Sequence, residues 1–311
     1  MNIADRRPTL ALALGGGGAR GLAHAGVLEV LCDAGVRPDR IYGVSVGSVV
    51  GAAFAFEPDI RTMLPKALAY LRSEAFRRYT DKVGENRKPE QRANVATPHD
   101  APPTFMTRVR GFVRAERAFH RMLASGSLLD GAVLHAVVEA LLPDADVAEA
   151  KVPLSIVAVD LVTGREVEIT KGPVRQAVLG SASLPGIFPP VPYGGCLLAD
   201  VGVVSSVPCH AARRGGYDVV VAVDVAQRVA ARRSFPTAVD VLLRMEDVAG
   251  SLFRELVFQH ADVIVRPDVT RLDWTDFSTM DEVIEHGRLA ARASLPDILA
   301  ALERTAARRT T

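Results

Sequence analysis

Short runs of consecutive apolar residues alternate along this chain with segments in which apolar residues recur every three or four positions. The first run, Leu10–Leu14, is followed by helical spacing over residues 22–34. A second run over residues 41–44 precedes a helix of small and apolar residues over Val46–Phe56. Strands and helices that alternate with short connections are typical of a parallel sheet covered by helices. The pattern therefore predicts an α/β fold.

The same alternation returns in the second half of the chain. The further strands are predicted over residues 154–159, 166–170, 197–199, Val219–Val223 and 263–266, and the further helices over residues 128–142, 174–181 and 280–292. We expect the tail, residues 304–311, to be frayed.

Residues 57–126 interrupt this pattern. They hold 14 Lys or Arg against 8 Asp or Glu, and their middle, residues 81–103, is broken by prolines. We interpret the middle as a mobile loop between helical pieces. The plain interpretation of the whole segment is a solvated basic insertion. The sharper one is a lid or a contact with anionic lipid headgroups.

Composition places the chain among ordinary globular proteins. Of 311 residues, 49% are hydrophobic and 23% charged, and the net charge of +1 gives no global basic field for nucleic acid. Three cysteines, Cys32, Cys196 and Cys209, form neither a disulfide framework nor a metal clip. The first apolar run is too short for a secretory signal, and residues 41–56 are too short to span a bilayer. We expect a cytoplasmic protein, with peripheral membrane contact under the sharper interpretation of the insertion.

A glycine-rich turn follows the first strand: residues 15–21 read Gly-Gly-Gly-Gly-Ala-Arg-Gly. The segment also satisfies the G-x-G-x-x-G pattern of dinucleotide-binding folds, but the second strand does not end in the acidic residue that would meet the ribose. No Gly-Lys-Ser/Thr follows, which excludes a Walker-type loop. Consecutive glycines let backbone N–H groups converge at the start of a helix, a geometry that suits an oxyanion.

A second glycine turn carries a serine. Ser45 lies in a G-x-S-x-G frame, between Gly43 and Gly47, where a strand turns sharply into a helix. This frame predicts an exposed nucleophile and acyl-transfer chemistry. None of the seven histidines, His24, His99, His120, His135, His210, His260 and His286, falls in a predicted strand-end turn.

Carboxylates are better placed to act as the base. Asp160, Asp200 and Asp224 each follow an apolar strand, at the edge where open α/β sheets place their sites. Asp160 and Asp224 could equally cap loops. Asp200 is favoured slightly, because glycines on both sides of its strand leave the backbone free to turn.

These motifs, in this order, resemble the bacterial patatin-like phospholipases. The family's G-G-G-x-R/K-G loop is matched by residues 16–21, its serine elbow by residues 43–47, its small-residue and proline segment by residues 181–190 and its D-G-G/A element by residues 200–202. The resemblance continues through residues 261–267 and leaves out residues 57–126.

The resemblance implies one domain over residues 1–311, a three-layer α/β/α sandwich with a mainly parallel sheet, and the insertion at 57–126. It implies a Ser–Asp dyad of Ser45 and Asp200 that hydrolyses lipid acyl esters through an acyl-serine, without metal or cofactor. The N–H groups of Gly16, Gly17 and Gly18 would form the oxyanion hole. The supporting residues would be Arg20, Gly21, Gly43, Gly47 and Gly202.

One position departs from the family pattern. Val201 stands where the family usually has glycine, and a β-branched residue would be strained there if the turn required a positive φ. Together with the insertion, this departure supports an alternative function: a regulatory or partner-binding protein that keeps the fold with little turnover.

Overall fold

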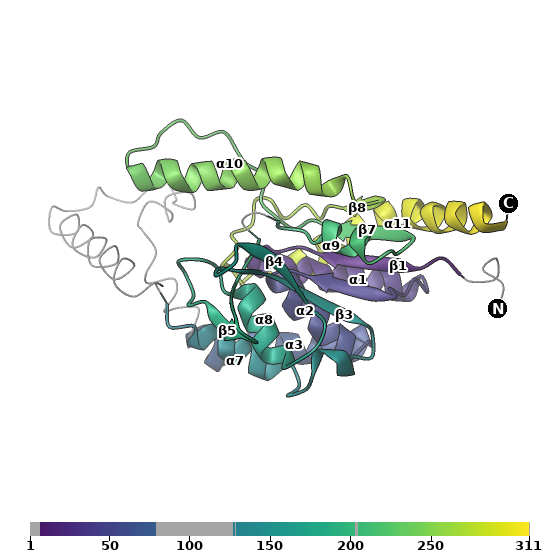
Figure 1. The fold of residues 1–311 in the computed structure, drawn as a ribbon, viewed down its shortest axis with the longest axis horizontal. Coiled ribbons are helices and arrows are strands. Elements are labelled where there is room, and N and C mark those ends of the chain that lie inside the picture. Colours follow the sequence, from purple (N-terminus) through teal and green to yellow (C-terminus); the bar gives the residue numbers. More distant parts are fainter. Residues whose placement is uncertain (1–6, 79–126, 128, 203–204, 311) are drawn as a thin grey trace.

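The chain folds around one twisted sheet (Figure 1). The computed structural model describes residues 7–78, 127, 129–202 and 205–310. The sheet order is β5-β6-β3-β2-β1-β7-β8, and β4 pairs with β3 beside this path. The strands are β1 (Leu10–Leu14), β2 (Arg40–Gly43), β3 (Leu154–Asp160), β4 (Arg165–Ile169), β5 (Val191–Tyr193), β6 (Cys196–Ala199), β7 (Val219–Val223) and β8 (Val263–Val265).

Pairing changes direction at β3. β1 is parallel to β2 and β7, β2 is parallel to β3 and β7 to β8, whereas β3 pairs antiparallel with β4 and β6. Continuous apolar strands such as β1 and β7 are fully buried, as expected of central strands covered on both faces. The sheet is therefore mixed, with a parallel centre.

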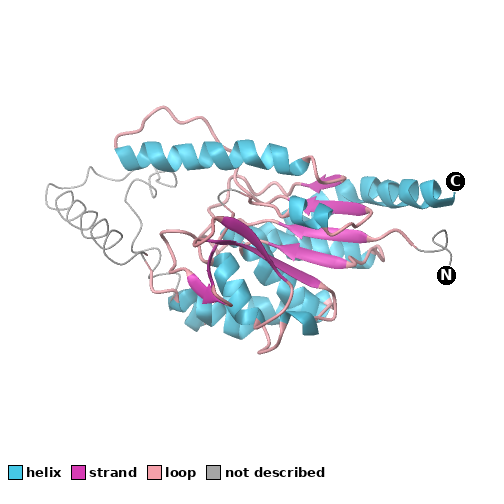
Figure 2. Cartoon of the chain, viewed as in Figure 1, coloured by secondary structure: helices cyan, strands magenta, loops and turns pink. Residues whose placement is uncertain are grey.

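The strands divide their side chains between two cores. In β1, Leu10, Leu12 and Leu14 join a large cluster, and Ala11 and Ala13 join a smaller one on the other face. The larger cluster lies under α1 (Ala23–Asp33), α2 (Val46–Phe56), α8 (Val174–Ala182) and α11 (Met280–Thr310). The smaller lies under α9 (Cys209–Arg214) and the last turn of α10 (Ala238–Phe258). Two helical layers of unequal weight thus enclose the sheet (Figure 2).

The remaining helices complete the larger layer and the glycine turn. They are α3 (Ile60–Leu71), α7 (Ala132–Leu141) and the 3-10 helices η2 (Gly18–Leu22) and η3 (Val147–Glu149). No helix in the described ranges is long and apolar enough to cross a membrane. The expected mobile loop over residues 81–103 lies outside the described residues, as does most of the basic insertion.

The predicted three-layer α/β/α fold is confirmed, with strand positions correct to within a residue or two. Several features differ from the prediction. The tail does not fray: α11 continues past Pro296 to Thr310, because Ile298 and Ala301 are buried and Arg309 pairs with Asp218. β5, α9 and α10 were not predicted.

Candidate active site

The serine elbow is the one place where the described backbone is strained at a residue other than glycine. Ser45, between β2 and α2, has φ 54° and ψ −130°. A Cβ at Gly43 would lie 2.5 Å from the Ser48 Cα, and one at Gly47 would lie 2.2 Å from the Leu14 carbonyl oxygen. Both glycines are thus required by the turn that presents the serine.

Two buried serines hold the backbone of this elbow. The Ser45 N–H donates to the Ser181 Oγ at 3.0 Å, and the Ser181 hydroxyl donates to the Val157 carbonyl at 2.7 Å. The Ser48 hydroxyl donates to the Ser45 carbonyl at 2.6 Å. The strained conformation is therefore fixed from both sides, by α8 and by α2 itself. Ser181 belongs to the small-residue segment noted in the sequence, whereas nothing there singled out Ser48.

Asp200 reaches Ser45 by an indirect route. β3 continues beyond the end of β2, because Gly43 is level with Ile156 and β3 ends at Asp160. β6 then runs back antiparallel, with Ala199 opposite Val159. Asp200 therefore returns to the level of the elbow. The prediction placed it at the carboxyl edge of the sheet, which is correct, but did not foresee that an antiparallel strand delivers it.

The Asp200 carboxyl is buried and accepts a hydrogen bond from the Gly202 N–H, which donates to Oδ1 at 2.7 Å. Burial raises the pKa of Asp200 to about 6, and the neighbouring Ser45 hydroxyl and the Gly202 N–H oppose part of the rise. A Cβ at Gly202 would lie 2.8 Å from Oδ1, so a larger residue would crowd the acceptor.

Val201 is accommodated without strain. Among the described residues, Ser45 alone combines a side chain with a positive φ, so the Val201 backbone lies in an ordinary region. Its side chain is buried in the smaller core. The departure from the family pattern therefore does not distort the aspartate turn.

The two competing aspartates serve local structure. Asp160 accepts hydrogen bonds from the Leu197 N–H at 2.9 Å and the Thr163 hydroxyl at 2.7 Å, which lower its pKa. Asp224 accepts from the Ala226 N–H at 3.1 Å, and burial raises its pKa. Of these three, only Asp200 has the Ser45 hydroxyl among the groups that set its pKa.

The glycine loop passes directly against the nucleophile. A Cβ at Gly16 would lie 3.0 Å from the Ser45 Cβ, so the close approach requires glycine. The Gly16 N–H, predicted to serve an oxyanion, donates instead to the Ser206 carbonyl at 2.8 Å. No described group accepts the N–H of Gly17 or Gly18. Of the three predicted donors, these two remain available to a ligand in this conformation.

Arg20 and Gly21 shape the loop from behind. The Arg20 Nε donates to the Gly17 carbonyl at 3.1 Å. Burial lowers the pKa of Arg20 to about 10, offset in part by Asp273, and the side chain stays charged at neutral pH. A Cβ at Gly21 would lie 2.2 Å from the Val46 Cγ1, so this glycine lets η2 pack against the start of α2.

His24 is a part of the loop that the sequence did not reveal. The fully buried ring places Nε2 2.7 Å from the Gly15 carbonyl oxygen, and burial lowers its pKa to about 4. The ring is neutral at physiological pH and donates from Nε2, since a carbonyl can only accept. In the sequence His24 was one of seven candidate bases. Its place one helical turn after Arg20 was the signal that could have indicated a role in holding the glycine loop.

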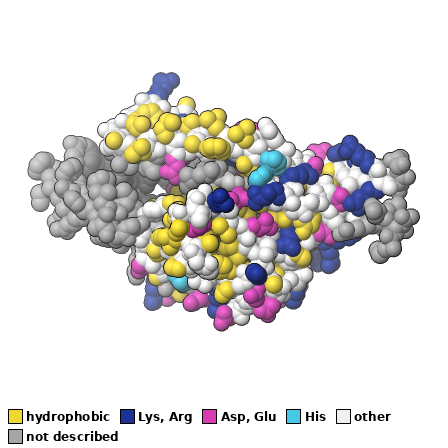
Figure 3. Space-filling model, in the orientation of Figure 1, with side chains coloured by type: hydrophobic (Ala, Val, Ile, Leu, Met, Phe, Trp, Pro, Cys, Tyr) yellow, Lys and Arg dark blue, Asp and Glu magenta, His cyan; other side chains and the backbone are white. Residues whose placement is uncertain are grey.

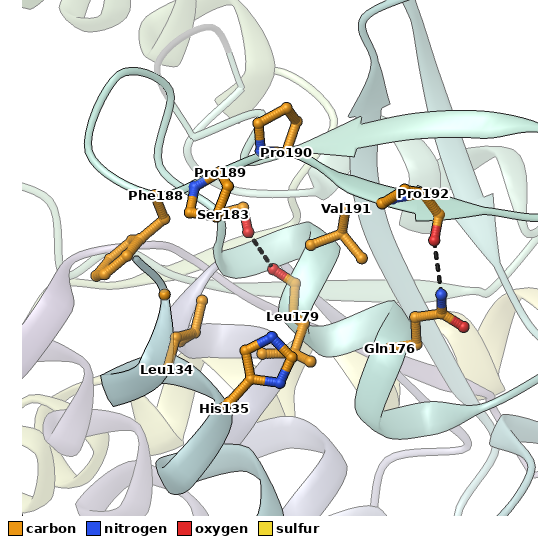
Figure 4. Close-up of a pocket in the computed structure, with 11 residues that line it drawn as sticks. Leu134, His135, Gln176, Leu179, Ser183, Phe188, Pro189, Pro190, Val191 and Pro192 are labelled. Atoms are coloured by element: carbon orange, nitrogen blue, oxygen red, sulfur yellow. Dashed lines mark hydrogen bonds between the residues drawn. The ribbon is translucent and has the colours of Figure 1, made fainter. Parts of the chain in front are cut away.

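A cavity of about 260 Å³ lies between α7, α8 and the proline-rich segment before β5, and neither Ser45 nor Asp200 lines it (Figure 4). Gln176, Leu179 and Ser183 line it from one face of α8, whereas Ser181, which bonds Ser45, lies on the other face. The Ser183 carbonyl accepts the Asp200 N–H at 2.9 Å. The cavity therefore shares a wall with the aspartate without opening on the serine.

Comparison with known proteins identifies the family to which the fold belongs. The family model described as patatin-like phospholipase matches residues 12–213, from β1 to α9. An uncharacterized NTE family protein of Mycobacterium tuberculosis is 27% identical over 94% of this chain and 48% of its own length. The human patatin-like phospholipase domain-containing protein 6 is 29% identical over 70% of this chain and 13% of its own length.

Solved structures give weaker similarity. VipD from Legionella pneumophila, at 15% identity and a TM-score of 0.44, covers 96% of this chain and 67% of its own. Human GIVD cytosolic phospholipase A2, solved with methyl gamma-linolenyl fluorophosphonate, is 15% identical with a TM-score of 0.45, over 98% of this chain and 60% of its own. The chain spans about half the length of the mycobacterial relatives that it matches.

Proposed function

Because this chain belongs to the patatin-like phospholipase family, we propose that it is a serine acylhydrolase acting on lipid acyl esters. The observation that carries the proposal is the strained Ser45 elbow beside the buried Asp200 carboxyl, whose pKa the serine hydroxyl lowers, next to a glycine loop with two N–H groups that no described group accepts. In this proposal the nucleophile, the base and the oxyanion donors meet at one edge of the sheet, each just after the end of a different strand.

The proposed reaction has two halves. Asp200 takes the Ser45 proton as Oγ attacks the ester carbonyl carbon, and the oxyanion that forms accepts from Gly17 and Gly18. As the tetrahedral intermediate collapses, the carbon–oxygen bond to the alcohol breaks and Asp200 gives its proton to the leaving oxygen. Water then repeats the sequence on the acyl-serine, releasing the fatty acid and restoring Ser45. Gly16 contributes by allowing the loop to approach, and Arg20 and His24 by holding its carbonyls.

Hydrolysis of a short-chain p-nitrophenyl ester tests this proposal. We expect Ser45→Ala to lower kcat/KM by roughly a thousandfold or more, because the covalent route is lost. Ser234→Ala, at an exposed serine before α10, is the matched control and should retain full activity. Equal rates in wild type and Ser45→Ala would contradict the proposal. Lipid profiling with the same pair would then identify the headgroup and acyl chain.

The alternative, a partner-binding protein with little turnover, has lost one of its two supports, because Val201 is unstrained. Its other support, the basic insertion, lies mostly outside the described residues. A fluorophosphonate probe separates the two functions. It should label Ser45 in the folded wild type and leave Ser45→Ala unmodified, whereas an unlabelled wild type would favour the alternative.

A further inference from the structure

α10 carries most of its large apolar side chains toward solvent, although Phe258 in its last turn is buried. Six of them are between 47% and 69% exposed: Val241, Leu242, Met245, Leu252, Phe253 and Leu256. At 100° per residue, all six fall within an arc of about 120° that runs almost the whole length of the helix. Figure 3 shows yellow side chains gathered along this helix. We call these six residues the apolar stripe.

The opposite side of α10 meets the protein through polar contacts of Arg254 and, in the last turn, through Phe258, which is buried in the smaller core. The Arg254 Nε donates to the Ser206 Oγ at 3.2 Å, and Nη1 donates to the Gln227 carbonyl at 3.3 Å. Arg254 lies about 160° around the helix from the middle of the stripe, and every acidic residue of α10 lies outside the stripe's arc. A surface helix ordinarily buries its apolar face, whereas the apolar stripe of α10 faces solvent.

A cationic segment adjoins one end of the stripe. Residues 225–237, which lead into α10, hold Arg228, Arg232 and Arg233 and no acidic residue. Arg232 pairs with Asp240 and covers the Phe235 ring, whereas neither Arg228 nor Arg233 forms an ion pair with a described residue. An apolar stripe flanked by unpaired arginines matches the layered chemistry of an anionic lipid surface, where acyl chains lie below negative headgroups.

The helix is also joined to the candidate active site. Ser206, which accepts from Arg254 through its hydroxyl, accepts the Gly16 N–H through its carbonyl. Ser206 therefore connects α10 to the glycine loop through a single residue. The family match ends at residue 213, before α10 begins, so this helix belongs to the part of the chain that the match leaves out.

We propose that α10 is an interfacial helix that inserts its apolar stripe into an anionic lipid surface, with Arg228 and Arg233 on the headgroups. The inference rests on the proposed function in one respect: an acylhydrolase of membrane lipids needs its site held against the bilayer. The partner that we propose for the stripe is a lipid bilayer of negative surface charge. A second copy of this chain, or another segment of it, is the competing occupant of the stripe.

Vesicle sedimentation of the full chain tests this inference, in the Ser45→Ala background so that no lipid is consumed. We expect binding to phosphatidylcholine vesicles that contain phosphatidylserine. Leu242→Glu with Leu252→Glu should weaken it by roughly tenfold or more for each leucine, since each loses an apolar side chain from the bilayer. Leu289→Glu is the matched control, another exposed leucine (54%) on α11, and should bind like the parent.

A second variant tests the charge. Arg228→Gln with Arg233→Gln should weaken binding by roughly fivefold for each arginine, with the effect confined to vesicles that contain phosphatidylserine. Equal binding by the stripe variant and its parent would overturn the proposal. A parent protein that does not bind vesicles would also overturn it. This holds whether the parent is a monomer or is a dimer that the stripe variant converts to a monomer.

Hydrolysis of a soluble short-chain ester separates this inference from the proposed function. With Ser45 restored, the stripe variant should keep the wild-type rate on that ester. Ester hydrolysis without vesicle binding would overturn the docking surface alone. Vesicle binding without ester hydrolysis would overturn the proposed function and leave the surface in place.

Discussion

The Ser45 hydroxyl lies close enough to the Asp200 carboxyl to lower its pKa, yet burial leaves this carboxyl harder to ionise than an exposed one. The pKa of about 6 leaves the carboxyl mostly ionised at neutral pH, yet closer to the working pH than an exposed aspartate would be. The pKa of such a base lies closer to that of the serine hydroxyl than the pKa of an ordinary carboxylate does, so the proton transfer is less unfavourable.

The acid limb of the pH–rate profile should follow this carboxyl. We expect kcat/KM for a soluble ester to fall about tenfold per pH unit below pH 6, because the protonated carboxyl cannot accept from Ser45. Asp160→Asn, which changes another strand-end carboxyl, should keep this limb. A limb centred near pH 4 in the wild type would contradict the role of Asp200.

The strained φ of Ser45 should appear as a reversal of the usual ranking of glycine and alanine. Ser45→Gly and Ser45→Ala both lose the hydroxyl, but only glycine relieves the positive φ. We expect Ser45→Gly to have a free energy of unfolding about 1 kcal/mol higher than Ser45→Ala. Urea unfolding measures both, and a more stable alanine variant would show that the elbow is not strained.

Asp200 and His24 should have opposite effects on acid stability. The pKa of Asp200 is raised in the folded state, so the folded protein gains protons, and stability, as the pH falls from about 6 toward 4. The pKa of His24 is lowered to about 4, so the unfolded state binds its proton first and stability is lost as the pH falls from 6.5. Each effect amounts to roughly 3 kcal/mol over its range.

Single variants should therefore separate the opposite contributions of Asp200 and His24 to acid stability, which nearly cancel in the wild type. Asp200→Asn should lose stability more steeply than wild type between pH 6 and pH 4, by up to roughly 3 kcal/mol. His24→Gln, which keeps a donor for the Gly15 carbonyl, should lose less than wild type over the same interval. Urea unfolding at stepped pH provides the measurement. Parallel curves for all three proteins would contradict the assignment.

Two glycines set the contact between α1 and α11. A Cβ at Gly26 would lie 2.1 Å from the Ile284 carbonyl oxygen, and one at Gly287 would lie 2.0 Å from that of Ala23. We expect Gly26→Ala and Gly287→Ala each to cost about 1–3 kcal/mol, with the double variant costing less than the sum, because the first substitution already separates the helices. A double-mutant cycle in urea checks this, and strict additivity would contradict it.

How much the sequence predicted depended on whether a residue's role was local. Ser45, Gly43 and Gly47 sit in one turn, so their spacing alone indicated the elbow. Asp200 was only narrowly preferred to Asp160, because its access to the serine depends on β6 running antiparallel to β3, and pairing direction leaves no mark on so short a strand.

Other features depended on contacts that no local pattern carries. The Gly16 N–H is taken by Ser206, a residue far along the chain, which is why the loop offers fewer donors than its glycines suggested. α10 was missed although its spacing is helical. It is also an element whose apolar stripe is largely exposed among the described residues, so no buried pattern marked it.

Ser206 holds two structures by different means. The glycine loop is held by its backbone carbonyl, which every amino acid possesses, whereas α10 is held by its hydroxyl, which few possess. Exchange of this one side chain during evolution would remove one of the contacts of α10 and spare the bond to the loop, while Phe258 would still anchor the end of the helix in the smaller core. The attachment of α10 can therefore change in related chains while the carbonyl that holds the glycine loop is inherited unchanged.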